Sequence, residues 1–221
     1  MNIMNKTQGG ILAGLEIALG AILMGFVSVY ASKLAQGIVF SVGLCLVVLT
    51  QSKLFTGQVF SLANPVLQKK SSLKVMWAGL LFFWLTNYVG SFLAALALYG
   101  ANIAQDTVVA FANIAQTKAA LSVPVLFIRG ILCNICVCLA VAVCQRVQTE
   151  TAKIMMCIGC VTIFVACGFE HSVANMTFLT LGQLYGVIGL QQTLYNLFFV
   201  TLGNLVGGWL VVALFHESKD S

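Results

Sequence analysis

The feature that most constrains this chain is a series of six long apolar runs separated by short polar segments. The runs cover about residues 11–30, 34–65, 75–99, 123–143, 154–188 and 194–215. A membrane-spanning helix takes roughly 20 predominantly apolar residues, so each run is long enough to cross a bilayer. Only 8% of the 221 residues are charged, which is too few to solvate a soluble particle of this size. These observations exclude a soluble globular enzyme and a disordered chain, and they predict an all-α membrane protein with six transmembrane helices.

Two of the six runs are interrupted by polar residues. The second is interrupted near residues 51–53 and the fifth at residues 168–175, which is the same place in each half of the chain. Three spans per half is an odd number, so the second half must enter the membrane from the opposite side. The pattern predicts an inverted 3+3 repeat with broken second and fifth helices, which in membrane proteins points to a transport site near the midplane.

A faint internal similarity supports this division. Residues 87–90 (Asn-Tyr-Val-Gly) match residues 204–207 (Asn-Leu-Val-Gly) at a separation of 117, and the interruptions at Phe55 and Phe169 are 114 residues apart. We therefore expect one transmembrane channel domain, residues 1–221, with repeats at 1–100 and 120–221.

The positive charges predict the orientation, because cytoplasmic loops of membrane proteins are enriched in lysine and arginine. With the N-terminus inside, the cytoplasmic segments hold seven of the 11 basic residues, namely Lys6, Lys69, Lys70, Lys74, Arg146, Lys153 and Lys219. The outer segments hold only Lys33 and Lys118. The residues before Ile11 lack the features of a signal peptide, so the first span is expected to be retained. We expect a multi-pass protein of the plasma (inner) membrane with both termini in the cytoplasm.

The interrupted helices suggest where chemistry takes place. A helix breaks inside a bilayer only where its freed N–H and C=O groups meet protein or a water-filled cavity. Each break also creates a helix N-terminus with positive partial charge and free amide donors, which suits an anion. Thr56 and Ser172 add hydroxyl groups beside those amides. The structural alternative is a pair of loops that merely pack together.

His171 is the only histidine in the apolar part of the chain, and it lies inside the second interruption. Ionisable groups are rare in a membrane interior and mark conduction paths by default. The adjacent Glu170 either bonds to loop amides and holds the turn, or titrates. Lys118, judged by its position alone, is a snorkelling interfacial anchor. Lys53 either attracts anions at a pore mouth or reaches the cytoplasmic headgroups.

Glu16 and Arg129 occupy corresponding positions in the first and fourth spans. Because both are charged groups within apolar runs, we expect them to bond to each other or to a neighbouring subunit, in a structural role.

The eight cysteines allow a different class of function. Cys133, Cys136 and Cys138 lie close together, and Cys157 and Cys160 form a Cys-x-x-Cys pair. All five lie within apolar runs, where small buried residues are the ordinary interpretation, so no metal and no cofactor are expected. The alternative is a membrane redox or metal-binding protein that uses these thiols.

Two further classes are excluded by what the chain lacks. The net charge of +5 is too sparse for a nucleic-acid surface. An aquaporin-type water pore needs Asn-Pro-Ala at each break, and the only prolines are Pro65 and Pro124.

Several segments resemble the formate/nitrite transporter family over nearly the whole chain. Residues 168–176 (Gly-Phe-Glu-His-Ser-Val-Ala-Asn-Met) resemble its specific fifth-helix signature, and residues 54–57 (Leu-Phe-Thr-Gly) its second-helix loop. Residues 133–141 and 200–208 resemble its fourth and sixth helices. One departure is Gln58, where many members carry asparagine or a small residue, and it bears on substrate preference.

The resemblance implies a homopentamer of aquaporin-like protomers, each with its own pore, in a lipid bilayer. It implies that His171 is the central pore histidine, Lys118 the vestibule lysine and Thr56 the polar contact on the second-helix loop. It also assigns the outward constriction to Phe40 and Phe164, the inward constriction to Leu44 and Leu54, and polar partners near the pore centre to Asn134 and Asn175.

A mechanism follows as a hypothesis. A bare monovalent anion does not cross a dry apolar constriction, because stripping its hydration costs many kcal/mol. We expect half-helix dipoles and Lys118 to draw the anion inward, and His171 to supply or relay a proton so that the neutral acid passes. The expected substrates are small monovalent anions of weak acids, with formate first, then hydrosulfide and nitrite. The protein is therefore expected to be a channel or transporter and not an enzyme.

Overall fold

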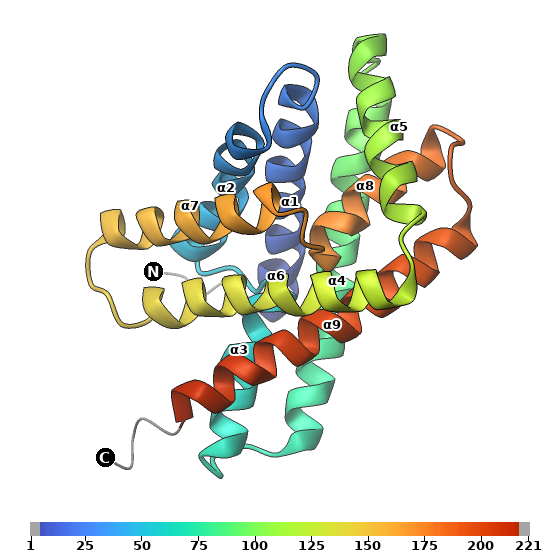
Figure 1. Cartoon of the computed structure of the whole chain (residues 1–221). Helices are drawn as coiled ribbons and strands as arrows, with labels where there is room; N and C mark the ends of the chain where they lie inside the picture. The colour runs from blue at the N-terminus through green and yellow to red at the C-terminus, as the bar shows by residue number, and fades with distance from the viewer. Residues whose placement is uncertain (1–4, 217–221) are drawn as a thin grey trace.

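The computed structural model describes residues 5–216 and folds them into helices joined by short connections (Figure 1). The described helices are α1 (Lys6–Val27), α2 (Lys33–Thr50), α3 (Phe55–Leu67), α4 (Leu73–Gly100), α5 (Gln105–Ala119), α6 (Val123–Cys144), α7 (Glu150–Ala166), α8 (Ser172–Leu184) and α9 (Leu190–His216). Lys219, one of the basic residues used to predict orientation, lies outside the described residues.

Five of these helices, α1, α2, α4, α6 and α9, are long and apolar enough to cross a membrane. Many of their large apolar side chains point away from the rest of the chain; Leu81, Leu85 and Leu93 of α4, for example, are 50–61% exposed. Apolar surface of this extent is stable only against lipid or another protein chain. The chain is therefore an all-helical, multi-pass membrane protein.

The long helices pack in pairs, with α1 against α4 and α6 against α9 (Figure 1). Glycine allows the close approach in both pairs. A Cβ atom at Gly90 of α4 would overlap the backbone oxygen of Ile11, and one at Gly207 of α9 would overlap that of Ile131. Small residues at helix contacts let backbones approach closely in membranes, where van der Waals packing holds helices together. Gly90 and Gly207 end the two matching sequence segments, so the repeated residues make equivalent contacts.

The matching asparagines also make equivalent hydrogen bonds at the starts of α3 and α8. Asn87 Oδ1 accepts from the Phe55 backbone N–H at 2.7 Å, and Asn204 Oδ1 accepts from that of Ser172 at 2.9 Å. Asn87 Nδ2 donates to the backbone oxygen of Lys53 at 2.9 Å. The partner of Phe55 in this pattern is Ser172, 117 residues later, which is three residues beyond the Phe169 that sequence comparison paired with it.

Asn204 completes the second copy of this arrangement. Its Nδ2 group donates to the backbone oxygens of Glu170 at 3.0 Å and Gly130 at 2.8 Å, as Asn87 Nδ2 does to those of Lys53 and Gly10. Each asparagine therefore satisfies one donor and two acceptors of the main chain, groups that would otherwise be left unpaired inside an apolar protein.

Residues 105–119 form helix α5, whereas the sequence indicated only a polar linker there. Its buried face consists of Thr107, Phe111 and Ala115, at the four-residue spacing of one helix face. The Phe111 ring lies 6.3 Å from that of Phe178 on α8. Because α5 has one narrow apolar face, it lacks the continuous apolar run by which the spans are recognised.

Helix α1 runs unbroken through Glu16, and Glu16 and Arg129 do not bond to each other within the described residues; a bond of either one to a neighbouring subunit stays a prediction. The Glu16 carboxylate is 5% exposed and accepts hydrogen bonds from Thr50 Oγ1 at 2.8 Å and Ser52 Oγ at 2.5 Å. Glu16 is thus satisfied by hydroxyl groups at the connection between α2 and α3, and Arg129 lies elsewhere.

Candidate functional site

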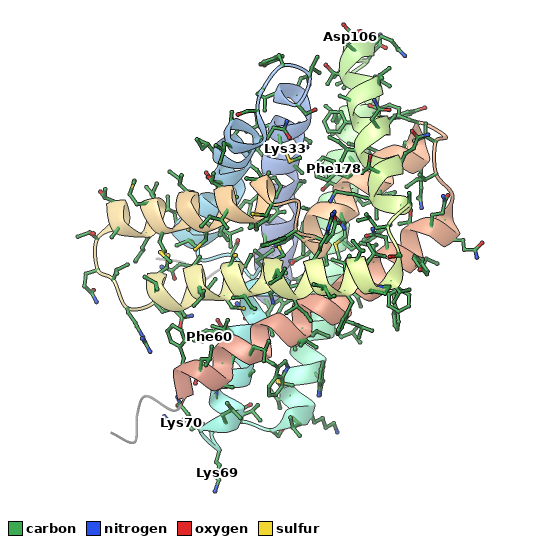
Figure 2. All side chains as sticks on the ribbon, viewed as in Figure 1. Lys33, Phe60, Lys69, Lys70, Asp106 and Phe178 are labelled. Carbon is green, nitrogen blue, oxygen red and sulfur yellow. The ribbon has the colours of Figure 1, made fainter. Side chains whose placement is uncertain are left out.

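A cavity of about 750 Å³ enters the protein from the end that carries Lys33 and Asp106. Figure 2 places these two residues at the upper end of the view, and Lys69 and Lys70 at the lower end. Helices α1, α2, α5, α6, α7 and α8 all contribute to its wall. Its lining includes His171, so the cavity connects one end of the molecule with the segment between α7 and α8.

His171 is 3% exposed and caps helix α8. Its Nδ1 atom accepts from the Ala174 backbone N–H at 3.1 Å, and its Nε2 atom lies 3.0 Å from Thr56 Oγ1. Because an atom that accepts a hydrogen bond carries no proton, this arrangement assigns the proton of the neutral ring to Nε2. The contact with Thr56 brings together the two interrupted regions of the sequence, 115 residues apart.

Two phenylalanines accompany the histidine. The Phe164 ring stacks on that of His171 with centroids 5.9 Å apart, and Phe40 meets Phe164 edge-on at 5.7 Å. Phe40 and Phe164 are 2% and 3% exposed, and both line the cavity. An apolar pair therefore lies beside the one ring of the cavity lining that can donate a hydrogen bond. Neither Leu44 nor Leu54 lines this cavity; both are buried in the core at 2% exposure.

Lys118 is not a snorkelling anchor, because it points inward and pairs with Glu170. Its Nζ atom lies 3.0 and 2.9 Å from the two carboxylate oxygens of Glu170. Asn175 Nδ2 donates to Glu170 Oε2 at 2.6 Å and to Asn196 Oδ1 at 2.8 Å. Asn196 Nδ2 in turn donates to the Lys118 backbone oxygen at 2.9 Å. A closed polar network therefore joins α5, α8 and α9 beside the cavity.

The other predicted polar residues lie apart from the cavity. Asn134 Nδ2 donates to the Asn204 backbone oxygen at 2.6 Å, and its Oδ1 atom has no hydrogen-bond partner within residues 5–216. Asn134 therefore joins α6 to α9 and does not line the outer cavity. Thr56 and Ser172 are fully buried at the starts of α3 and α8, and Ser172 Oγ is also unpartnered in this part of the chain.

Four residues at or near the site were not predicted to belong to it: Asn87, Asn204, Asn196 and Arg129. The sequence repeat includes Asn87 and Asn204, but their structural role was not predicted. The signal for that role was a polar residue at the same depth in two apolar runs. Asn196 is likewise a polar residue within an apolar run. Arg129 lines the cavity, and its backbone oxygen accepts from the Glu170 N–H at 3.2 Å. The signal that could have identified Arg129 as a site residue was its charge within a membrane-spanning run.

The eight cysteines are all free thiols, five of them buried. The thiols of Cys45 and Cys144 donate to backbone oxygens of α7, Cys45 Sγ to that of Ile154 at 4.0 Å and Cys144 Sγ to that of Lys153 at 3.6 Å. Among residues 5–216, no group of three or more His, Cys, Asp or Glu side chains is arranged to hold a metal ion. Metal analysis of the purified protein is the test of the redox or metal-binding alternative.

Comparison with solved structures identifies two close matches. An "FNT family ion channel" superposes with a TM-score of 0.88 at 33% identity, covering 96% of this chain and 89% of that chain. A "pentameric formate channel with formate bound" superposes with a TM-score of 0.82 at 27% identity, covering 96% and 94%. The whole helical arrangement is thus shared with known channels.

Sequence comparison agrees with the structural match. The nitrite transporter NirC of Salmonella typhimurium is 38% identical over 178 residues, covering 77% of this chain and 65% of NirC. The formate channel FocA of Haemophilus influenzae is 36% identical over 160 residues, covering 68% of this chain and 54% of FocA. The matched part of this chain thus spans less than two thirds of either relative.

The family profile described as "Formate/nitrite transporter" matches residues 1–217. With nearly the whole sequence matched and the fold shared with channels of known structure, this chain belongs to the formate/nitrite transporter family.

Proposed function

We propose that this protein conducts small monovalent anions of weak acids across a membrane, together with a proton, along a path centred on His171. The observation that carries this function is the contact of His171 Nε2 with Thr56 Oγ1 at 3.0 Å, at the inner end of a cavity and beside Phe40 and Phe164. A hydrogen-bonding ring thus stands where an anion would have to lose its water before meeting apolar side chains.

The same function explains the arrangement of the helices. We infer that the chain is one channel domain whose two halves form an inverted repeat, with α2–α3 and α7–α8 as broken spans. The equivalent bonds of Asn87 and Asn204 support this, as does the nearly complete burial of α8 among other helices. Irregular backbone is tolerated at membrane depth only where protein or a cavity surrounds it.

Proton transfer at His171 is constrained by its capping bond. If the neutral ring of His171 donated its proton directly, it would become an imidazolate anion. If the ring were an imidazolium, its Nδ1–H would face the Ala174 N–H, and two donors would meet with no acceptor between them. His171 therefore acts best as an orienting donor: its Nε2–H, which faces Thr56 Oγ1, moves its hydrogen bond to the anion or to a water molecule, and the proton reaches the anion through water. The neutral acid then passes the phenylalanines and loses its proton on the far side.

Formate and nitrite are the first substrates to test. The sequence favoured formate slightly over hydrosulfide and nitrite; the relatives named above include transporters or channels for formate and for nitrite. The pentameric formate channel also supports a homopentamer for this chain. The segregation of Lys69 and Lys70 from Lys33 and Asp106 supports an outward-facing cavity and cytoplasmic termini (Figure 2).

Uptake of radiolabelled formate into proteoliposomes, competed with nitrite and hydrosulfide at two pH values, tests this function. We expect uptake to rise as the external pH falls, and H171F to abolish that pH dependence. H171N is the matched control for folding, because asparagine is a good N-cap and its side-chain oxygen replaces Nδ1 as acceptor from Ala174.

Both variants are therefore expected to lose pH-dependent uptake, while H171F alone loses about 0.5–2 kcal/mol of stability with the cap. Uptake by H171F and H171N that matches wild type at both pH values would show that the path does not depend on this residue.

A further inference from the structure

The charges that line the cavity do not contribute equally to its potential. The cavity wall holds Lys33, Lys118, Arg129, Asp106 and Glu170. Lys118 Nζ lies within 3.0 Å of both Glu170 oxygens, so these two charges compensate each other over the short distance of the pair. The positive charge of Lys118 is therefore partly compensated by the carboxylate of Glu170.

Two of the remaining charges lie at the rim. Lys33 starts α2 and Asp106 lies in the first turn of α5, and both are exposed (Figure 2). Their signs are opposite, and charges in contact with water are screened by salt over about 8–10 Å. They do not supply a lasting positive potential inside the cavity.

Arg129 is the remaining cation, and it lies deeper. It stands in the second turn of α6 and is half-buried. A Cβ built on Gly168 would lie 3.8 Å from Arg129 Nη1, which places the guanidinium beside the turn that leads to His171. Within residues 5–216, Arg129 has no ion-pair partner. Its positive charge is thus uncompensated and less screened than the charges at the rim.

We propose that Arg129 attracts anions into the cavity and selects among them. This role rests on the proposed function, because it concerns anions that enter by this cavity. A guanidinium presents a planar fork of donors that matches two oxygen atoms on one centre. Formate and nitrite have such a pair of oxygens, whereas hydrosulfide presents one sulfur atom. Arg129 therefore favours formate and nitrite over hydrosulfide.

Three variants separate charge, shape and packing. R129Q removes the charge, R129K keeps the charge without the fork, and R146Q removes the other arginine of the chain, at the far end of α6 and away from the cavity. All three leave the backbone bond between the Arg129 oxygen and Glu170 in place. If R129Q fails to fold, R129K still tests selection among anions.

In proteoliposomes, R129Q is expected to raise the KM for formate and nitrite about tenfold, and to weaken the salt dependence of uptake. R129K is expected to keep the salt dependence but to reduce the preference for formate over hydrosulfide about threefold or more. R146Q is expected to behave like wild type. A purely structural Arg129 would lower the maximal rate or the stability without changing anion preference.

A measurement without transport separates this inference from the proposed function. Ala110 of α5 lines the same cavity, so A110C offers a thiol there, with its parent protein correcting for native cysteines. R129Q should lower the ratio of labelling rates by negatively and positively charged methanethiosulfonates about threefold or more. An unchanged ratio together with an unchanged KM would overturn the role of Arg129. A lowered ratio in a protein that takes up none of the anions would contradict the proposed function and leave Arg129 as the source of the potential.

Discussion

At the scale of single residues, the polar network beside the cavity explains why charged groups are tolerated at this depth. Glu170 is 4% exposed, and its carboxylate is satisfied by Lys118 Nζ and Asn175 Nδ2. Burial of an unpaired carboxylate is costly, whereas a paired and hydrogen-bonded one is tolerated. Lys118 and Glu170 therefore hold the α5–α8 contact, beside the histidine but without touching it.

This pairing makes a prediction about stability. K118Q should lower the free energy of unfolding by roughly 2–4 kcal/mol, because it leaves the Glu170 carboxylate without its cation. The double variant K118Q/E170Q should recover most of that loss, since no buried charge remains. Thermal unfolding of the detergent-purified protein measures both. A double variant no more stable than K118Q would show that the loss of stability in K118Q does not come from an unpaired Glu170 carboxylate.

How far single residues can be predicted from sequence depends on the kind of signal. His171 is identifiable because a lone ionisable group in an apolar run is unusual. Its contact with Thr56 joins residues 115 apart, and neither its distance nor the orientation of the ring follows from spacing. Because Arg129 and Glu16 lie at matching depth, the sequence predicts that they bond to each other or to a neighbouring subunit. Depth alone does not determine which neighbour a side chain faces, and Glu16 bonds instead to hydroxyl groups.

At the scale of helices, the starts of α3 and α8 depend on one asparagine each. A helix leaves its first N–H groups without internal partners, and within a membrane no water satisfies them in the apolar region. Asn87 and Asn204 each accept one of these N–H groups and donate to two backbone oxygens, one of them immediately before the helix. The two half-helices are therefore anchored in the same way.

Substituting aspartate tests this equivalence. N87D and N204D keep the acceptor for the helix N–H but lose the donor to two buried oxygens, so each should cost about 2–4 kcal/mol. N113D, on the exposed face of α5, should change stability by less than about 0.5 kcal/mol. Chemical unfolding of the three variants in detergent gives the comparison. A large cost for one asparagine and none for the other would contradict an equivalent role in two repeats.

The sequence predicted those helices whose residues form a continuous apolar run. The predicted runs at 75–99 and 123–143 correspond closely to α4 (Leu73–Gly100) and α6 (Val123–Cys144). Helix α5 was not predicted, because its apolar side chains recur on one face only and its mean hydropathy is that of a linker. Asp106 in its first turn and Lys118 in its last turn complement the helix dipole and are the signal that could have identified it.

At the scale of the whole molecule, the scarce charge has distinct uses. The polar ends carry most of the lysines, Lys69 and Lys70 at one end and Lys33 at the other (Figure 2). Inside, the ion pair of Lys118 and Glu170 joins α5 to the start of α8, and Arg129 lines the cavity without an ion-pair partner in the described residues. Within the described residues no lysine or arginine side chain is hydrogen-bonded to His171. The proposed passage of a neutral acid agrees with this arrangement, because no cation bonded to the ring would hold the anion beside the phenylalanines.

We propose that the anion crosses the apolar constriction as its neutral acid. This proposal is tested most directly by recording internal pH and membrane current together while formate enters proteoliposomes, with protein-free vesicles as the blank. We expect one proton to be taken up with each formate, the interior to become more acidic, no current to flow, and H171F to lose the protein-dependent signal. Formate entry that carries current and leaves the internal pH unchanged would contradict it.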